Sequence, residues 1–117
     1  MAIETCRTTE DREKLRKDPQ IAKIVGQIVR NIQPETVLVF GSRSKGQGDA
    51  ESDLDLLVIY SGSLSKREVQ LAVRRLFPEP VFGMDIFVMS PEEFEHQRHV
   101  ANALAREVAE TGIVCYE

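Results

Sequence analysis

Hydrophobic side chains recur along the chain with two different periods, and these periods predict its helices and strands. The clearest helical stripe spans residues 21–32, where apolar side chains return every three or four positions. Asp18 can cap this helix, Pro19 suits its first position, and Pro34 ends it. We therefore expect a core helix whose inner face carries Ile21, Ile24, Val25, Ile28, Val29 and Ile32.

Three short apolar runs, at 36–40, 54–60 and 81–89, predict strands. Between the second and third runs, Ser65 and Glu68 have the spacing of a capping box, which indicates the start of a helix. This helix would place its apolar residues on one inner face and end at two prolines. Its inner residues would be Val69, Ala72, Val73, Leu76 and Phe77.

A second capping box, formed by Ser90 and Glu93, has proline at the first helical position. We expect the helix that it opens to continue to about Glu110. Residues 113–116 can then add a short last strand. The inward side chains of this helix would be Phe94, Val100, Ala101, Leu104 and Val108.

This order of elements predicts an α/β (α+β) fold in which helices cover one side of a sheet. At 117 residues the chain can bury one hydrophobic core, so we expect a single domain over residues 1–117. Residues 7–17 are almost all charged and have little to bury. We expect residues 1–17 to form a solvated, mobile arm or a partner-binding element.

Charge and cysteine content narrow the function classes. A net charge of −4 argues against strong nucleic-acid binding through bulk charge, although a local basic patch stays open. No apolar run approaches the roughly 20 residues that cross a membrane, and the first residues lack a signal-peptide pattern. Cys6 and Cys115 are far apart in sequence, and reduced thiols are favoured over a disulfide. We therefore expect a cytoplasmic protein.

The candidate chemistry begins where the first predicted strand ends, at Gly41 and Ser42. Glycine can adopt a positive φ and let a ligand approach the backbone, and the turn's N–H groups and the serine hydroxyl could hold an anion. Arg43 and Lys45 lie within reach of such a ligand, although alone they fit an ordinary solvated turn. The segment matches neither a Walker A loop nor a dinucleotide fingerprint.

Carboxylates supply the second part of the predicted site. Asp53 and Asp55 are two residues apart at the start of a strand, so both side chains point to the same face. Such close like charges repel unless a cation joins them. Asp85 lies within an apolar strand, where burial would be costly, and we interpret it as a third ligand rather than an edge-strand charge. We expect His96 and His99 to be surface residues.

Three carboxylates beside a phosphate-holding turn predict metal-assisted phosphoryl or nucleotidyl transfer. Two Mg²⁺ ions suit oxygen-only ligands and can clamp the attacking and leaving oxygens of an in-line displacement. The pair Asp53 and Asp55 would hold both ions, and Asp85 would bind the ion beside the attacking hydroxyl.

Gly41-Ser42, followed after ten residues by Asp53-x-Asp55, resembles the signature of the polymerase-beta-like nucleotidyltransferase superfamily. Asp85 is where that family keeps its third carboxylate, and the match covers roughly residues 34–90. The resemblance implies that family's fold, a small mixed sheet with helices packed mainly on one face. The short chain is similar to the minimal nucleotidyltransferase branch, whose members commonly act as antitoxins beside a HEPN-domain ribonuclease toxin, with MntA-like proteins as the example.

The resemblance implies transfer of AMP from ATP to a tyrosine hydroxyl of such a toxin (AMPylation), with Mg²⁺ as cofactor. Gly41 and Ser42 would hold the terminal phosphates, and Asp53, Asp55 and Asp85 would carry the metal and help activate the hydroxyl. The chain lacks the added helical domain of larger members, so a partner protein could complete the site, and an oligomer or hetero-oligomer stays open. Two alternatives remain: a binding module that neutralises a toxin by occlusion, and transfer to a small molecule or an RNA end.

Overall fold

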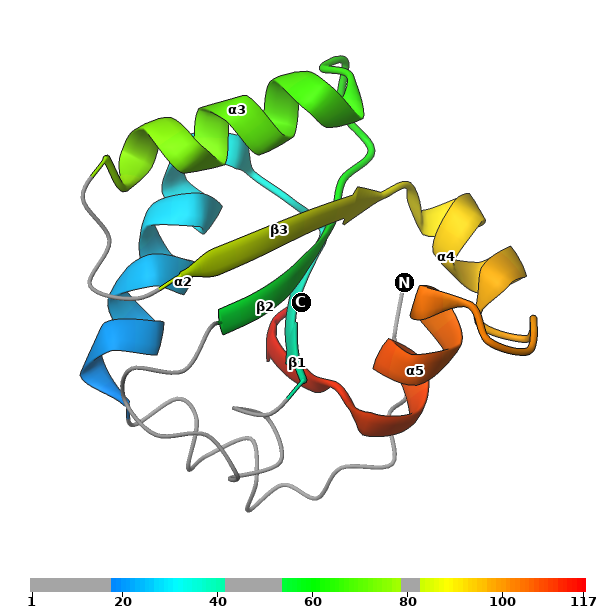
Figure 1. Cartoon of the computed structure of the whole chain (residues 1–117). Helices are drawn as coiled ribbons and strands as arrows, with labels where there is room; N and C mark the ends of the chain where they lie inside the picture. The colour runs from blue at the N-terminus through cyan, green and yellow to red at the C-terminus, as the bar shows by residue number, and fades with distance from the viewer. Residues whose placement is uncertain (1–17, 42–53, 79–82) are drawn as a thin grey trace.

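The computed structural model describes residues 18–41, 54–78 and 83–117, which form a four-stranded sheet with helices on its two sides (Figure 1). The expected strands at 36–40, 54–60 and 113–116 and the first two expected helices are confirmed, with ends shifted by a residue at most. In chain order the elements are α2 (Pro19–Ile32), β1 (Thr36–Phe40), β2 (Leu54–Ile59), α3 (Lys66–Leu76), β3 (Met84–Met89), α4 (Pro91–Gln97), α5 (Leu104–Thr111) and β4 (Ile113–Tyr116).

The sheet has the strand order β3-β2-β1-β4 and is mixed. β1 pairs antiparallel with both β2 and β4, whereas β2 and β3 are parallel and are joined through α3. Such a parallel pair needs a crossover, and the capped helix between the two strands supplies it. β3 and β4 are the edge strands. In this order β2, which carries Asp55, is the neighbour of β3, which carries Asp85.

The two faces of the sheet are covered by different helices. α2 and α3 pack on one face, where their buried residues join Val37, Leu56 and Val88 in one apolar cluster. α4 and α5 pack on the other face, where Phe94 and Val108 join Leu38 and Leu57 in a second cluster. The expectation of helices mainly on one face therefore holds for the two long helices only. The short α4 and α5 form a third layer, because each has a buried apolar stripe of its own.

The last predicted helix is interrupted, which corrects the expectation of one helix up to Glu110. α4 ends at Gln97, and α5 begins at Leu104. Between them Asn102 adopts a left-handed backbone with φ 64°, a conformation that asparagine tolerates better than most residues. The break turns the chain so that both Phe94 and Val108 reach the sheet, and it leaves Val100, expected to point inward, 46% exposed.

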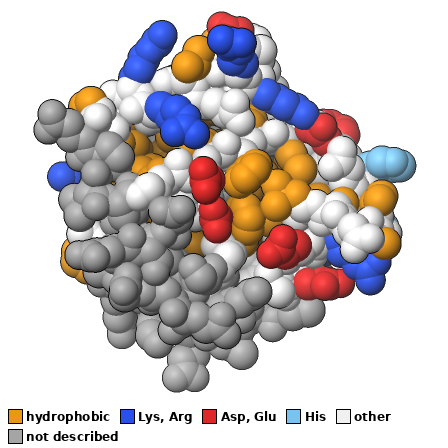
Figure 2. Space-filling view, in the orientation of Figure 1, with side chains coloured by type: hydrophobic (Ala, Val, Ile, Leu, Met, Phe, Trp, Pro, Cys, Tyr) orange, Lys and Arg blue, Asp and Glu red, His pale blue; other side chains and the backbone are white. Residues whose placement is uncertain are grey.

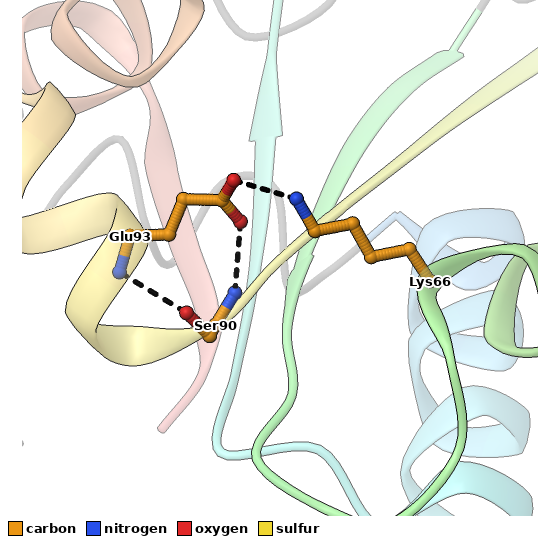
Figure 3. Close-up of polar contacts among 3 residues, drawn as sticks. All are labelled: Lys66, Ser90 and Glu93. Carbon is orange, nitrogen blue, oxygen red and sulfur yellow. Dashed lines mark hydrogen bonds and ion pairs between the residues drawn. The ribbon is translucent and has the colours of Figure 1, made fainter.

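Two polar contacts tie α3 to later parts of the chain, one to α4 and one to the middle of β3. Lys66 Nζ at the start of α3 forms an ion pair of 2.6 Å with Glu93 Oε2 in α4 (Figure 3). Glu93 is also part of the confirmed capping box, since Ser90 Oγ accepts from the Glu93 N–H and Glu93 Oε1 accepts from the Ser90 N–H. One glutamate therefore caps α4 and ties it to the helix layer on the opposite face.

Midway along α3, Gln70 Nε2 donates a hydrogen bond of 3.0 Å to the backbone carbonyl of Ile86 in β3. The carbonyls of Gly83 and Met89 accept from β2 and its continuation, so the period of two puts the Ile86 carbonyl on the outer edge of the strand. The side chain of Gln70 thus satisfies an edge acceptor that has no neighbouring strand.

Among the described residues, no helix is both long enough and apolar enough to cross a membrane. Cys115 lies in β4 and is half-buried, whereas Cys6 and the predicted arm, residues 1–17, lie outside the described part of the chain. The predicted start of the third strand, at Val81 and Phe82, falls outside it as well.

We expect Glu93→Ala to lower the free energy of unfolding by about 1 kcal/mol, because the helix loses its reciprocal cap. Lys66→Met should cost less, at most about 1 kcal/mol, because the lysine side chain is 55% exposed and solvent screens the pair. Chemical denaturation of both variants and of the double variant measures the two contributions. Glu92→Ala is the matched control for loss of an acidic residue in the same helical turn. Equal stability of the Glu93 and Glu92 variants would contradict the role given to the cap.

Candidate active site

The site forms on the sheet face that carries α4 and α5, at the end of the sheet farthest from α4. β2 and β3 are paired in register, with Asp55 opposite Asp85. Paired residues of neighbouring strands share a face and have Cα atoms roughly 5 Å apart. The structure therefore places these two predicted carboxylates side by side, which confirms their adjacency while leaving their chemical role a prediction.

Gly41 lies directly against Asp55. It follows Phe40, which is opposite Asp55 on the antiparallel side of β2, and it has φ +79°. A Cβ atom at this position would overlap Asp55 Oδ2 and lie 3.2 Å from its Cγ. Glycine is thus required here twice, once for the left-handed backbone and once for the close approach of a carboxylate. One residue of the predicted turn, Gly41, is therefore adjacent to one of the predicted carboxylates, Asp55.

The two carboxylates have different surroundings. Asp55 is half-buried in a central strand, whereas Asp85 is exposed on the edge strand β3. The reasoning that burial of Asp85 would be costly is therefore wrong, since its side chain reaches solvent. Asp85 is still included in the candidate site, because it is paired with Asp55 on the neighbouring strand.

Four of the predicted site residues lie outside the described part of the chain, namely Ser42, Arg43, Lys45 and Asp53. Within the described residues no group of three or more potential metal ligands comes together. Asp55 and Asp85 contribute two carboxylates, and the sequence spacing predicts that Asp53, outside the described residues, would be a third. Carboxylate oxygens of this kind fit Mg²⁺ rather than a softer metal.

An apolar surface continues from the carboxylates along the same sheet face. Phe87 is two residues after Asp85, and its ring packs against Phe40 with centroids 5.6 Å apart. Figure 2 shows acidic side chains directly beside a gathered hydrophobic patch over the region between β3 and α5. Sequence reasoning missed Phe87, although its spacing of two from Asp85 was the available signal.

The histidines of α4 and the segment after it lie elsewhere, as expected. His96 and His99 line a shallow hollow with Glu35, Ser61, Glu92 and Glu95. His99 Nε2 is 3.7 Å from Glu95 Oε1, and both side chains are largely exposed. This arrangement is a solvated helix surface rather than a second metal site within the described residues.

Comparisons with known proteins identify the family and the fold. The family model for polymerase beta nucleotidyltransferases matches residues 22–117. One similar solved structure is a toxin-antitoxin complex with AMP-PNP, at 18% identity and a TM-score of 0.52, covering 80% of this chain and 71% of that one. Another is a protein inferred to be a nucleotidyltransferase, from Sulfolobus solfataricus, at 18% identity and a TM-score of 0.51, covering 90% of this chain and 82% of that one. Among curated proteins none matches significantly.

We expect Gly41→Ala to destabilise the protein by roughly 1–2 kcal/mol or more, because alanine is strained at this φ and its Cβ meets the Asp55 carboxylate. Gly26→Ala is the matched control, because nothing lies within 4 Å of a Cβ there. Gly26 is inside α2, where alanine should stabilise by about 0.5–1 kcal/mol. Urea unfolding should therefore show shifts of opposite sign. An unchanged midpoint for Gly41→Ala would disprove the close packing at the site.

Proposed function

The chain belongs to the polymerase beta nucleotidyltransferase family and has its fold, and from this premise we propose that it transfers AMP from ATP to a protein hydroxyl. The observation that carries the proposal is the in-register pair Asp55 and Asp85 beside Gly41. This constellation puts adjacent carboxylates next to a glycine turn whose backbone a phosphate could approach. Both parts are needed for nucleotidyl transfer, and a scaffold that only binds a partner needs neither.

In the proposed reaction the acceptor oxygen attacks the α-phosphorus of ATP. The new O–P bond forms as the bond from the α-phosphorus to the bridging oxygen of the leaving group breaks, and pyrophosphate departs. Gly41 and Ser42 would hold the terminal phosphates of ATP. Asp53, Asp55 and Asp85 would hold Mg²⁺, which when bound supplies charge stabilisation for both the attacking and the leaving oxygen. Asp85, the exposed carboxylate, would face the acceptor and draw the proton from its hydroxyl.

For the acceptor we propose a tyrosine of a HEPN-domain ribonuclease toxin, which makes this protein an antitoxin. Three observations support this choice. The chain resembles the minimal nucleotidyltransferase branch, and one structural neighbour is a toxin-antitoxin complex with AMP-PNP, an ATP analogue. In addition, α4 and α5 leave Asp85 and Phe87 exposed on their sheet face, so the acceptor side is open to a protein-sized partner.

We expect Asp55→Asn and Asp85→Asn each to reduce AMP transfer by at least about a hundredfold, because each removes a negative charge that holds the metal, and two factors of ten correspond to about 2.7 kcal/mol in the barrier. Asp53→Asn should behave in the same way. The measurement is transfer of label from α-³²P-ATP with Mg²⁺ to a HEPN-domain ribonuclease supplied as acceptor.

Glu92→Gln is the control for that experiment, since it removes an exposed carboxylate of α4 away from the carboxylate pair. Thermal unfolding of each variant separates a chemical loss from a folding defect. Undiminished transfer by Asp55→Asn would disprove its proposed role. A toxin that is bound and inhibited without any label would favour occlusion instead.

A further inference from the structure

Phe87 is a large aromatic residue with an exposed ring on the face of the candidate active site. Its neighbours in β3, Ile86 and Val88, are buried on the opposite face. Phe87 itself is 37% exposed, and it points to the same side as Asp85, two residues earlier. At about 3.3 Å per residue, the two side chains leave the strand roughly 7 Å apart. The strand thus presents a carboxylate and an aromatic ring in a row.

The ring of Phe87 packs against a second ring on the same face of the sheet. Phe40 is 5% exposed, and the two centroids are 5.6 Å apart with the planes inclined at 52°. Phe40 is paired with Asp55 and directly precedes Gly41, so it lies next to two residues of the candidate site. Aromatic rings at this separation attract one another beyond their simple burial. Phe87 is therefore a supported aromatic surface with part of its ring open to solvent.

We propose that Phe87 contacts the phenol ring of the acceptor and selects aromatic hydroxyls over aliphatic ones. This inference rests on the proposed function and specifies the acceptor side of the same site. A phenol packed on Phe87 extends its hydroxyl from the far end of its ring. The distance from the centre of the phenol ring to its oxygen, plus one hydrogen bond of about 2.7 Å, is comparable to the spacing between Phe87 and Asp85. Ring contact and hydroxyl activation are then possible at the same time.

Other hydroxyl acceptors fit this surface less well. A serine hydroxyl is next to its own backbone, so its side chain offers nothing to cover the ring of Phe87 while the oxygen approaches Asp85. A ribose has no planar aromatic ring to pack on Phe87, so it would gain less from this contact. A phenol also loses its proton more readily, with an ordinary pKa of about 10. In the transfer step that proton passes to Asp85 or solvent as the oxygen bonds to the α-phosphorus and pyrophosphate leaves.

The test compares two small acceptors, N-acetyltyrosinamide and N-acetylserinamide, in the presence of Mg²⁺-ATP. Phe87→Leu keeps an apolar side chain without the ring, and Phe87→Trp keeps an aromatic one. Val100→Ala is the control, because Val100 is an exposed apolar residue between α4 and α5 that the site does not use. Transfer is followed by mass spectrometry of the acceptor, and binding is followed by saturation-transfer NMR on the phenol protons with a non-hydrolysable ATP analogue.

We expect the wild type to modify the tyrosine derivative in preference to the serine derivative. Phe87→Leu should lower kcat/KM for the tyrosine derivative by about tenfold through KM, with Phe87→Trp and Val100→Ala close to wild type. Equal transfer by Phe87→Leu, or equal use of the two acceptors by the wild type, would overturn the inference.

The binding measurement separates this inference from the proposed function. If the wild type transfers AMP to neither derivative, the phenol signal decides. A phenol signal that is present in the wild type and lost in Phe87→Leu would support the aromatic contact while the transferase proposal failed. A phenol signal that is absent, or unchanged in Phe87→Leu, would refute the contact whatever the enzyme does. Thermal unfolding of the Phe87 variants confirms that the comparison is made on folded protein.

Discussion

The constraint on which this structure depends is the parallel register of β2 and β3, which places Asp55 and Asp85 opposite one another. Like charges on neighbouring strands would favour a register that separates them, yet both side chains are on the same face of the sheet. The pairing persists because the other residues of the same strands, such as Leu56 and Val88, are buried against α2 and α3. A shift of one residue would move that apolar set to the wrong face. Packing on one face thus keeps the two carboxylate-bearing positions paired on the other.

The two faces of the sheet are covered by helices of different length. The face under α2 and α3 is covered by long, regularly patterned helices. Within the described residues the opposite face is covered less, because α4 and α5 are short and α4 lies at the end of the sheet away from Asp55 and Asp85. Lys66 and Glu93 connect the two layers, so the partial cover is held at a fixed place. The open area is therefore a consequence of helix length as well as of sheet topology.

The sequence was sufficient wherever the determining interaction is local. The caps at Asp18, Ser65 and Ser90 act within one helical turn, and all three are present in the structure. It was insufficient where the outcome depends on distant partners or on one backbone angle. Asn102, with its left-handed backbone, lies where the last predicted helix is interrupted. The pattern of hydrophobic residues gives no sign of this interruption. The exposure of Asp85 follows from β3 being an edge strand, which is a property of the topology rather than of the strand. The roles of Ser42, Arg43, Lys45 and Asp53 remain predictions from sequence.

The hydrogen bond from Gln70 to Ile86 also bears on how the protein behaves at high concentration. An edge strand with unsatisfied carbonyl groups is a template on which another chain can add a strand, and such addition leads to self-association and fibre growth. Gln70 occupies one of those acceptors with a side chain from the same molecule. β3 can therefore carry functional groups at the rim of the sheet with less risk of recruiting copies of itself. The glutamine thus blocks one site of strand addition as well as attaching α3 to the sheet.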